Sequence, residues 1–385
     1  MKHYDVAIIG AGAAGLSAAA VALRNGRRVL VLDMGDTPAR KVAASGGGRC
    51  NFTNAAAGIN RYFGENPNFI RGALARVTPH DILDWMSEHN LAWTEKEPGR
   101  YFCQTGASDV VRALLNDARG ADIRTGITVH DVRRGNNDGF VVDSSAGEFY
   151  AARVIIATGG MSFGAYGVSD VGYKIAKRFG HKIVPPRPAL CPIVTPIFGP
   201  DFAGMSTPVQ ISIAGRTVSG NMLFTHFGIG GPAVYSASIA PTGHDIHINF
   251  APDCDMTVWI RGQKRENGRK TLAKILSTIM PTQLARYFGA GTCNIADMRD
   301  TELLDIAHHI NDFVIPAASW RHHGVTAAEV TSGGIATSDI SSKTMESKLC
   351  PGLFFTGEVI DITGDLGGFN LHWAFASGRV AGANV

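Results

Sequence analysis

The stretch from Tyr4 to Asp33 constrains the fold more than any other part of this 385-residue chain. An apolar run leads into Gly10-Ala11-Gly12-Ala13-Ala14-Gly15, an alanine-rich run continues to Leu23, and a second apolar run ends at Asp33. This order predicts a strand, a glycine turn, a helix and a second strand. The glycines allow a tight turn, close approach of the backbone to a pyrophosphate and close packing of helix on strand, and Asp33 can accept a hydrogen bond from a ribose hydroxyl. The stretch therefore predicts an α/β fold with a Rossmann-like dinucleotide-binding unit.

The same apolar stretch has a competing interpretation as a signal peptide or a membrane span. Three glycines in six residues suit a turn better than a spanning helix, and the strand pattern continues to Asp33. The six cysteines are scattered and contain no C-x-x-C pair, which indicates neither a zinc site nor a dense disulfide framework. We therefore expect a reduced, cytoplasmic chain that does not associate with a membrane.

The overall charge is close to neutral, with 36 basic and 33 acidic residues and a formal net charge of +3. Such a balance predicts no strong binding to polyanions, although it does not exclude a local basic patch. We therefore expect a small-molecule substrate and no nucleic acid as partner. The oligomeric state is left open.

A second glycine-rich segment covers residues 40–54 and surrounds Gly46-Gly47-Gly48 with Arg40, Lys41, Arg49 and two asparagines. The segment has neither helical nor strand periodicity. Its N–H groups and cations favour a loop that folds around an anionic ligand. Cys50 lies in this loop and is interpreted more readily as a packing residue than as a reactive thiol.

Two later strands end in small or acidic residues, at the end where open α/β sheets bind ligands. Residues 153–160 end in Ala157-Thr158-Gly159-Gly160, and residues 352–358 end in Gly357-Glu358. Asp361 and Gly367-Gly368-Phe369-Asn370 follow, before a closing helix over residues 371–383. The chain has no second G-x-G-x-x-G, so no separate domain for a nicotinamide dinucleotide is expected.

The composition shifts at Pro185-Pro186-Arg187-Pro188, where short strands with Gly and Pro replace the α/β pattern. We predict a discontinuous cofactor-binding domain made of residues 1–187 and 329–385. Residues 188–255 are predicted to form an inserted β-rich domain, and residues 256–328 an inserted helical domain.

Four motifs together resemble the YhiN/BaiN-like family of bacterial flavoproteins, which includes aminoacetone oxidases and has a glutathione-reductase-like FAD fold. They are residues 45–54 (SGGGRCNFTN), 223–228 (LFTHFG), 345–348 (MESK) and 367–371 (GGFNL). The resemblance covers essentially the whole chain and implies non-covalent FAD. Two positions depart from the family pattern, Asn221 where Glu is frequent and Gly230 where Ser is usual. Both bear on substrate identity rather than on FAD.

The resemblance also implies which residues contact FAD, from the pyrophosphate and adenosine to the ribityl chain and flavin. They are Gly10, Gly12, Ala13, Ala14, Gly15, Asp33, Met34, Arg40, Lys41, Gly47, Gly48, Arg49, Cys50, Asn51, Val129, Ala157, Thr158, Gly159, Gly160, Gly357, Glu358, Asp361, Gly367, Gly368, Phe369 and Asn370.

The expected function is that of an FAD-dependent oxidoreductase that transfers hydride between a small organic substrate and the flavin N5. Either NAD(P)H or O2 is the expected electron partner, and both amine or amino-ketone oxidation and C=C reduction are compatible with the family. A redox sensor without turnover and a nucleic-acid-linked flavoprotein are the alternatives. His226, His372 and Tyr166 are the candidate catalytic residues. A structural role is the alternative for each of the two histidines, and Tyr166 is expected in a loop that reaches the cavity. His244 and His247 have a metal-like spacing but no further ligand nearby, so no metal is expected.

Overall fold

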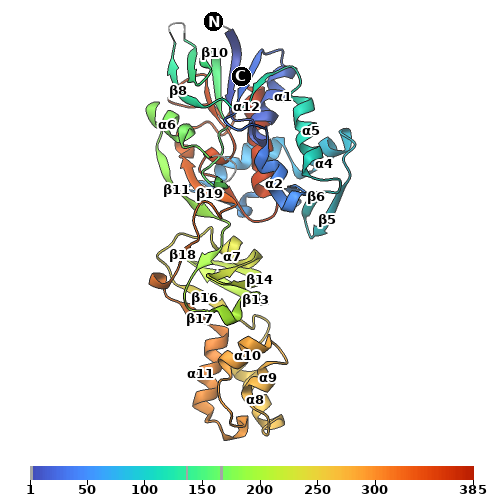
Figure 1. Ribbon diagram of the computed structural model, residues 1–385, viewed down its shortest axis with the longest axis vertical. Coiled ribbons are helices and arrows are strands. Elements are labelled where there is room, and N and C mark those ends of the chain that lie inside the picture. The colour runs from blue at the N-terminus through green and yellow to red at the C-terminus, as the bar shows by residue number, and fades with distance from the viewer. Residues whose placement is uncertain (1–2, 136–137, 165–167) are drawn as a thin grey trace. The chain divides into compact units, whose positions relative to one another are not determined.

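The computed structural model describes residues 3–135, 138–164 and 168–385, and the chain forms two compact units (Figure 1). The discontinuous unit comprises Met1–Arg187 and Glu329–Val385, and the inserted unit comprises Pro188–Ala328. Among the described residues, no helix is long and apolar enough to cross a membrane.

A seven-stranded sheet is the centre of the discontinuous unit, with the strand order β7-β2-β1-β10-β9-β8 and with β20 also paired to β10. Strand β1 (His3–Ile9) lies between β2 (Val29–Leu32) and β10 (Gly147–Ile156) and is parallel to both. Strand β20 (Leu353–Phe355) is parallel to the last residues of β10. The α/β fold predicted from the sequence is confirmed. Strands β2 and β20 are apolar and buried along their whole length, as expected for parallel strands whose two faces are both covered.

Helix α1 (Ala13–Arg24), which is rich in alanine, packs on β1 and β2 and against α12 (Phe369–Ala383) (Figure 1). A Cβ atom added to Gly378 would lie 2.3 Å from the carbonyl oxygen of Ala14, and one added to Gly382 would lie 2.4 Å from that of Ala18. The glycines of α12 therefore allow its backbone to approach that of α1. This contact joins the two ends of the chain beside the glycine turn.

The remaining strands and longer helices of the discontinuous unit surround this arrangement. They are α2 (Arg40–Gly48), β3 (Asn51–Asn54), β4 (Tyr62–Phe63), α3 (Arg71–Arg76), α4 (Pro79–Glu88), β5 (Trp93–Glu97), β6 (Arg100–Cys103), α5 (Ala107–Asp117), β7 (Asp122–Arg124), β8 (Val129–Arg134), β9 (Phe140–Ser144), α6 (Val171–Arg178), β11 (Ile183–Ala189), β19 (Val330–Ile335) and β21 (Thr363–Gly364).

The inserted unit combines a second seven-stranded sheet, of order β17-β16-β13-β14-β15-β12-β18, with a group of helices. Its elements are β12 (Ile193–Val194), β13 (Ser206–Ile213), β14 (Arg216–Thr225), β15 (Gly228–Gly230), α7 (Pro232–Ala237), β16 (Ile246–Asn249), α8 (Met256–Glu266), α9 (Leu272–Leu276), α10 (Thr282–Phe288), α11 (Asp300–Asn311), β17 (Phe313–Ile315) and β18 (Arg321–His322).

The predicted boundary at 255/256 does not separate two inserted domains. Strands β17 and β18 follow the helices in sequence but pair with β16 and β12 of the sheet, and residues 188–328 form one unit. The chain returns to complete the sheet, because the edges beside β16 and β12 offer free backbone hydrogen-bonding groups.

Candidate functional site

The turn between β1 and α1 has two kinds of glycine. A Cβ added to Gly10 would lie 2.3 Å from the carbonyl oxygen of Ala157, and one added to Gly15 would lie 1.9 Å from that of Gly10. A Cβ added to Gly12 would meet no atom within 4 Å. Gly10 and Gly15 therefore close the turn, whereas Gly12 faces open space. No side chain caps the first turn of α1, whose N–H groups and dipole favour an anion there.

Asp33 lies beside this turn, at the end of β2. Its Oδ2 accepts a hydrogen bond from the N–H of Ala11 at 2.7 Å, and its Oδ1 accepts one from the N–H of Gly35 at 2.8 Å. Arg40 Nη2 lies 3.7 Å from Asp33 Oδ1. The carboxylate thus orders the backbone of the glycine turn. Met34, next in sequence, is 40% exposed.

The connection from β7 to β8 runs next to Asp33. The N–H of Ile127 donates to the carbonyl of Asp33 at 2.9 Å, and the N–H of Gly126 donates to that of Gly35 at 2.7 Å. Val129, for which an adenine contact is predicted, is buried at the start of β8 and pairs with Ser144. Neither Gly126 nor Ile127 has a chemical signature in the sequence, because their backbone makes these contacts.

The glycine-rich segment after Asp33 is partly helical, although its sequence has no helical periodicity. Residues from Arg40 onward form α2, and the backbone leaves helical geometry at Ser45, Gly46 and Gly47, with φ of 59° at Gly46 and 64° at Gly47. Gly47, Gly48 and Arg49 are exposed, and a Cβ added to either glycine would meet no atom within 4 Å.

Cys50 and Asn51 close this segment and face inward. Cys50 is fully buried, and burial raises the pKa of its thiol to about 12. The side-chain amide of Asn51 has one orientation in which both its nitrogen and its oxygen are hydrogen-bonded. In this orientation Nδ2 donates to the carbonyl of Tyr101, and Oδ1 accepts from the N–H of Gly368. Asn51 thereby ties the segment to the start of α12.

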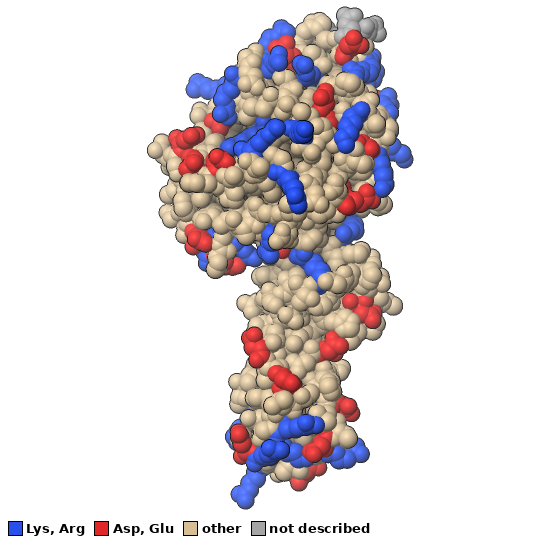
Figure 2. All heavy atoms as spheres, turned by 180° about the vertical axis from the view of Figure 1, so that it is seen from behind, with Lys and Arg blue, Asp and Glu red and all other residues tan. Residues whose placement is uncertain are grey.

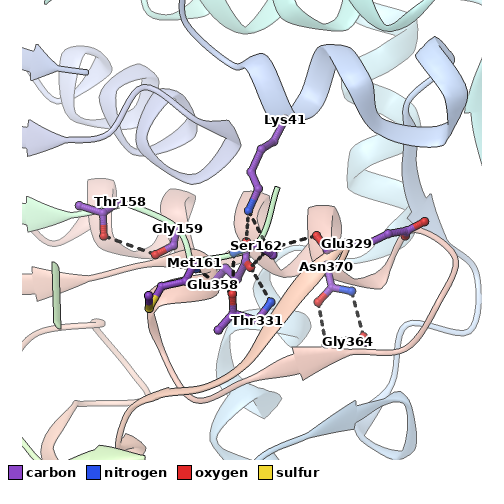
Figure 3. Close-up of polar contacts among 10 residues, drawn as sticks. All are labelled: Lys41, Thr158, Gly159, Met161, Ser162, Glu329, Thr331, Glu358, Gly364 and Asn370. Carbon is purple, nitrogen blue, oxygen red and sulfur yellow. Dashed lines mark hydrogen bonds and ion pairs between the residues drawn. The ribbon is translucent and has the colours of Figure 1, made fainter. Parts of the chain in front are cut away.

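A half-buried polar network lies where β10 and β20 end (Figure 3). Lys41 Nζ lies 2.9 Å from Glu358 Oε2 and donates to Ser162 Oγ at 3.1 Å. Glu358 Oε1 accepts two hydrogen bonds, one from Ser162 Oγ at 2.9 Å and one from the N–H of Thr331 at 2.8 Å. Thr331 Oγ1 in turn accepts the N–H groups of Met161 and Ser162 at 2.8 and 3.0 Å. Neither Ser162 nor Thr331 stood out in the sequence, because isolated hydroxyl residues carry no pattern.

This network fixes the charge of Glu358. Burial alone would raise the pKa of Glu358, but the Lys41 ammonium and the hydrogen bonds from Lys41, Thr331 and Ser162 outweigh it and hold that pKa below its usual value. A Cβ added to Gly160 would lie 2.5 Å from both Glu358 Oε1 and Thr331 Oγ1. Gly160 therefore packs on the network. Gly159 has a left-handed φ of 73°, and its carbonyl accepts a long hydrogen bond from Thr158.

The start of α12 is held by side-chain amides. Asn54 Nδ2 donates to the carbonyl of Gly367 at 2.7 Å, and Asn370 accepts from the N–H of Gly364 at 2.8 Å and donates to its carbonyl at 2.9 Å. Asp361 is buried nearby, accepts the N–H of Glu65 at 2.8 Å and has a pKa that burial raises. Phe369 is fully buried, and its carbonyl accepts the Tyr62 hydroxyl.

Of the candidate catalytic residues, His372 belongs to the discontinuous unit and His226 to the inserted unit. His372 is fully buried, with Nε2 at 3.0 Å from the carbonyl of Val77 and Nδ1 at 2.8 Å from Thr53 Oγ1. A carbonyl only accepts, so Nε2 carries the proton and Nδ1 accepts the Thr53 hydroxyl. Both ring nitrogens are thus occupied, which argues against the predicted catalytic role and for a structural one. His226 is exposed in the turn between β14 and β15 of the inserted unit. Tyr166 lies outside the described residues.

The residues present fit an adenine dinucleotide in the discontinuous unit. Open space adjoins the backbone at Gly12, Gly47 and Gly48, an uncapped helix begins beside the first of these, and Asp33 ends the next strand. These features match the needs of a pyrophosphate and a ribose. Among residues 3–135, 138–164 and 168–385, no group of three or more His, Cys, Asp or Glu side chains is arranged to hold a metal ion.

Comparison with known proteins places residues 4–384 within the family described as HI0933-like protein Rossmann domain. A ribosomal RNA dihydrouridine synthase of Escherichia coli is 37% identical over 391 residues, which cover 98% of this chain and 96% of that protein. The Haemophilus influenzae protein of the same name is 37% identical over 402 residues, covering 100% and 99%. A 3-dehydro-bile acid delta(4,6)-reductase of Clostridium scindens is 28% identical, covering 98% of each chain.

Two solved structures share the fold. A flavocytochrome c3 fumarate reductase in its open conformation has a TM-score of 0.50 at 17% identity, covering 100% of this chain and 78% of that one. A 3-ketosteroid-delta4-(5alpha)-dehydrogenase from Rhodococcus jostii has a TM-score of 0.50 at 13% identity, covering 99% and 96%.

The expectation that nucleic acid is not a partner is contradicted by the two relatives named for ribosomal RNA, which match this chain over nearly its whole length. The expectation rested on the net charge of the whole chain. A whole-chain charge is a sum, and it does not report how cations are distributed over the surface.

Proposed function

The chain belongs to the HI0933-like family of Rossmann-fold flavoproteins and is an FAD-dependent oxidoreductase, and we propose that it reduces uridine in ribosomal RNA to dihydrouridine. The observation that carries this proposal is the 37% identity to two relatives with that name, over 98% and 100% of this chain. Identity at this level along the full length extends through both units.

The chemistry of a C=C reduction is common to the named relatives. Dihydrouridine is uridine whose C5=C6 bond has gained two hydrogens, and the delta in the name of the bile acid reductase denotes a C=C bond. The uracil C5=C6 bond is conjugated to the C4 carbonyl, so hydride adds at C6 and a proton at C5. We propose NADH or NADPH as the reductant, which supplies two electrons and one hydrogen and leaves as the oxidised nicotinamide, while water supplies the proton.

When bound, FAD supplies the hydride transfer between the nicotinamide and the uracil ring. The residues of this chain hold the cofactor and order its surroundings. We propose that Gly12 and the start of α1 receive the pyrophosphate, and that Asp33 meets the adenosine ribose. The Lys41–Glu358 pair keeps a fixed charge arrangement at the ends of β10 and β20, and Asn51 and Asn370 hold the loop before α12.

The test uses the purified holoprotein and ribosomal RNA transcribed in vitro, which carries no modifications. After anaerobic reduction by NADPH or NADH, addition of the RNA should restore the absorbance of oxidised flavin, and nucleoside mass spectrometry should detect dihydrouridine. Reoxidation by a steroid enone, with none by RNA, would instead favour the small-molecule C=C reductase suggested by the 28% identical relative. The matched control is the same RNA with protein lacking FAD.

A further inference from the structure

The charges of the inserted unit are segregated along its sequence. Residues 256–299, which we call the α8–α10 segment, contain eight Lys and Arg residues and only two acidic ones, Glu266 and Asp297. Residues 188–255 contain one Arg and four Asp, and residues 300–328 contain one Arg and four acidic residues. The unit is neutral as a whole, and its cations are concentrated on three consecutive helices and the turns between them.

Most of these cations are exposed. The exposed ones are Arg261, Arg265, Arg269, Lys270, Lys274, Arg286 and Arg299. The eighth, Lys264, is half-buried and lies 2.7 Å from Asp300 Oδ1. Within the part of the chain that the structure describes, no ion pair joins the seven exposed cations to a carboxylate. Figure 2 shows Lys and Arg side chains over the end of the inserted unit that carries these helices, with Asp and Glu side chains among them.

The fold holds these cations on ordered elements. On α8, Met256 and Ile260 are buried, while Arg261 and Arg265 lie one turn apart on the exposed side. Lys264 also donates to the carbonyl of Met298 at 2.6 Å, which ties α8 to the start of α11. Helices α9 and α10, which carry Lys274 and Arg286, pack on each other. The positive charges are therefore presented at positions set by the helices.

The eight cations of the segment outnumber its two acidic residues, and their mutual repulsion suits a polyanion that supplies further negative charge. Arg side chains dominate, and their planar guanidinium groups match phosphate oxygens in pairs.

We propose that the α8–α10 segment binds the phosphate backbone of ribosomal RNA and so docks the substrate of the enzyme. The inference rests on the proposed reduction of uridine in ribosomal RNA and adds the surface that receives it. Phosphate contacts set affinity and position, whereas choice of the target uridine belongs to other contacts.

The test compares two full-length holoproteins with the wild type. The segment variant carries Arg265→Gln, Arg269→Gln, Lys274→Gln and Arg286→Gln. The control variant removes four exposed cations of the discontinuous unit, with Arg71→Gln, Arg119→Gln, Lys177→Gln and Lys343→Gln. Binding of unmodified ribosomal RNA is measured by fluorescence anisotropy over a range of salt concentrations. FAD content and thermal unfolding establish that each variant is folded.

The segment variant should bind RNA at least about tenfold more weakly than the wild type. Each lost phosphate contact should reduce the steepness of log K against log salt concentration by about 0.7 to 0.9, so the four substitutions together should reduce it by about 3. The control variant should bind like the wild type. A Glu266→Gln variant, which removes an acid from the segment, should bind RNA a few-fold more tightly. This gain could not arise from loss of folding.

Equal RNA binding by the segment variant and the wild type would overturn the inference, as would an equal loss in the control variant. Tighter binding of the wild type to phosphatidylglycerol vesicles than to RNA would also overturn it, in favour of an anionic lipid surface. Dihydrouridine formation separates the two proposals. If the wild type forms it and the segment variant binds normally, only the docking surface is refuted. If the segment variant loses binding and no protein forms dihydrouridine, only the reaction is refuted.

Discussion

Lys41 Nζ lies 2.9 Å from Glu358 Oε2, although 317 positions separate the two residues in the chain. The side chains of Lys41 and Glu358 are only 33% and 19% exposed. This ion pair connects the glycine-rich segment after β2 with the strand end that precedes α12. Both segments are predicted to contact the cofactor, and the ion pair joins them directly.

Lys41→Met should lower the free energy of unfolding by about 2 kcal/mol at neutral pH, because it leaves a largely buried carboxylate without its cation. This loss of free energy of unfolding is smaller than the loss expected when a fully buried ion pair is broken. The Lys41–Glu358 pair is partly solvated, and Ser162 and Thr331 still contact Glu358 in the variant. Urea unfolding of the apoprotein measures it. The double variant with Glu358→Gln should recover most of the loss.

The pH dependence of that loss follows from the depressed pKa of Glu358. The stabilisation is present above the unfolded value of 4.5 and is lost as pH falls through the lower folded value. Lys41→Met and the wild type should therefore converge in stability as the pH falls below the folded pKa of Glu358. A difference that persists unchanged in acid would show that Lys41 stabilises the fold by packing alone.

His372 should make the protein less stable as the pH falls from 6.5 to about 4. Burial lowers its pKa to about 4 from 6.5, so the unfolded chain binds this proton first. The resulting loss in the free energy of unfolding reaches about 3 kcal/mol at pH 4, the acid end of this range. Urea unfolding at several pH values should show a shallower pH slope for His372→Gln. His80→Gln, at a histidine whose side chain is 82% exposed, should leave the slope unchanged.

Gly12→Ala should separate folding from cofactor binding. The added methyl group meets no protein atom within 4 Å, so the stability of the apoprotein should change by less than about 1 kcal/mol. If the pyrophosphate lies there, FAD affinity should fall at least about tenfold, which corresponds to about 1.4 kcal/mol. Fluorescence titration of apoprotein with FAD measures the affinity.

Two matched glycines serve as controls for that experiment. Gly262→Ala also adds a methyl group to open space, within α8, and should leave FAD affinity unaltered. Gly15→Ala should destabilise the apoprotein itself, because its methyl group would overlap the carbonyl of Gly10. Normal FAD affinity in Gly12→Ala would contradict the assignment of the pyrophosphate to this turn.

Cys293 should account for the fast reaction of the native protein with a thiol reagent, because it is the exposed cysteine among the six. Cys50 is buried and its raised pKa keeps the thiol protonated at pH 8, so it should react only after unfolding. Ellman's reagent measures both rates. Cys293→Ser should abolish the fast phase, whereas Cys50→Ser should preserve it. Fast labelling of Cys50 in the native state would revive its interpretation as a reactive thiol.

The sequence is sufficient to predict those features of the protein that depend on one short, contiguous segment. The α/β fold and the FAD-dependent oxidoreductase class both follow from residues 4–33 and from motifs that remain contiguous in the chain. The local charge count of residues 256–299 was also readable in the sequence. The net charge of the whole chain does not reveal this local excess, because acidic residues elsewhere cancel it.

What the sequence determined by itself was the order of strand, turn and helix around Gly12, because backbone geometry depends on neighbouring residues. The tertiary structure decided which distant groups meet. It paired Lys41 with Glu358, brought Ser162 and Thr331 to the same carboxylate, and placed Gly126 and Ile127 beside Asp33. It also buried His372 with both ring nitrogens occupied. Such contacts depend on the order of the strands in the sheet, and this order cannot be predicted from a local sequence pattern.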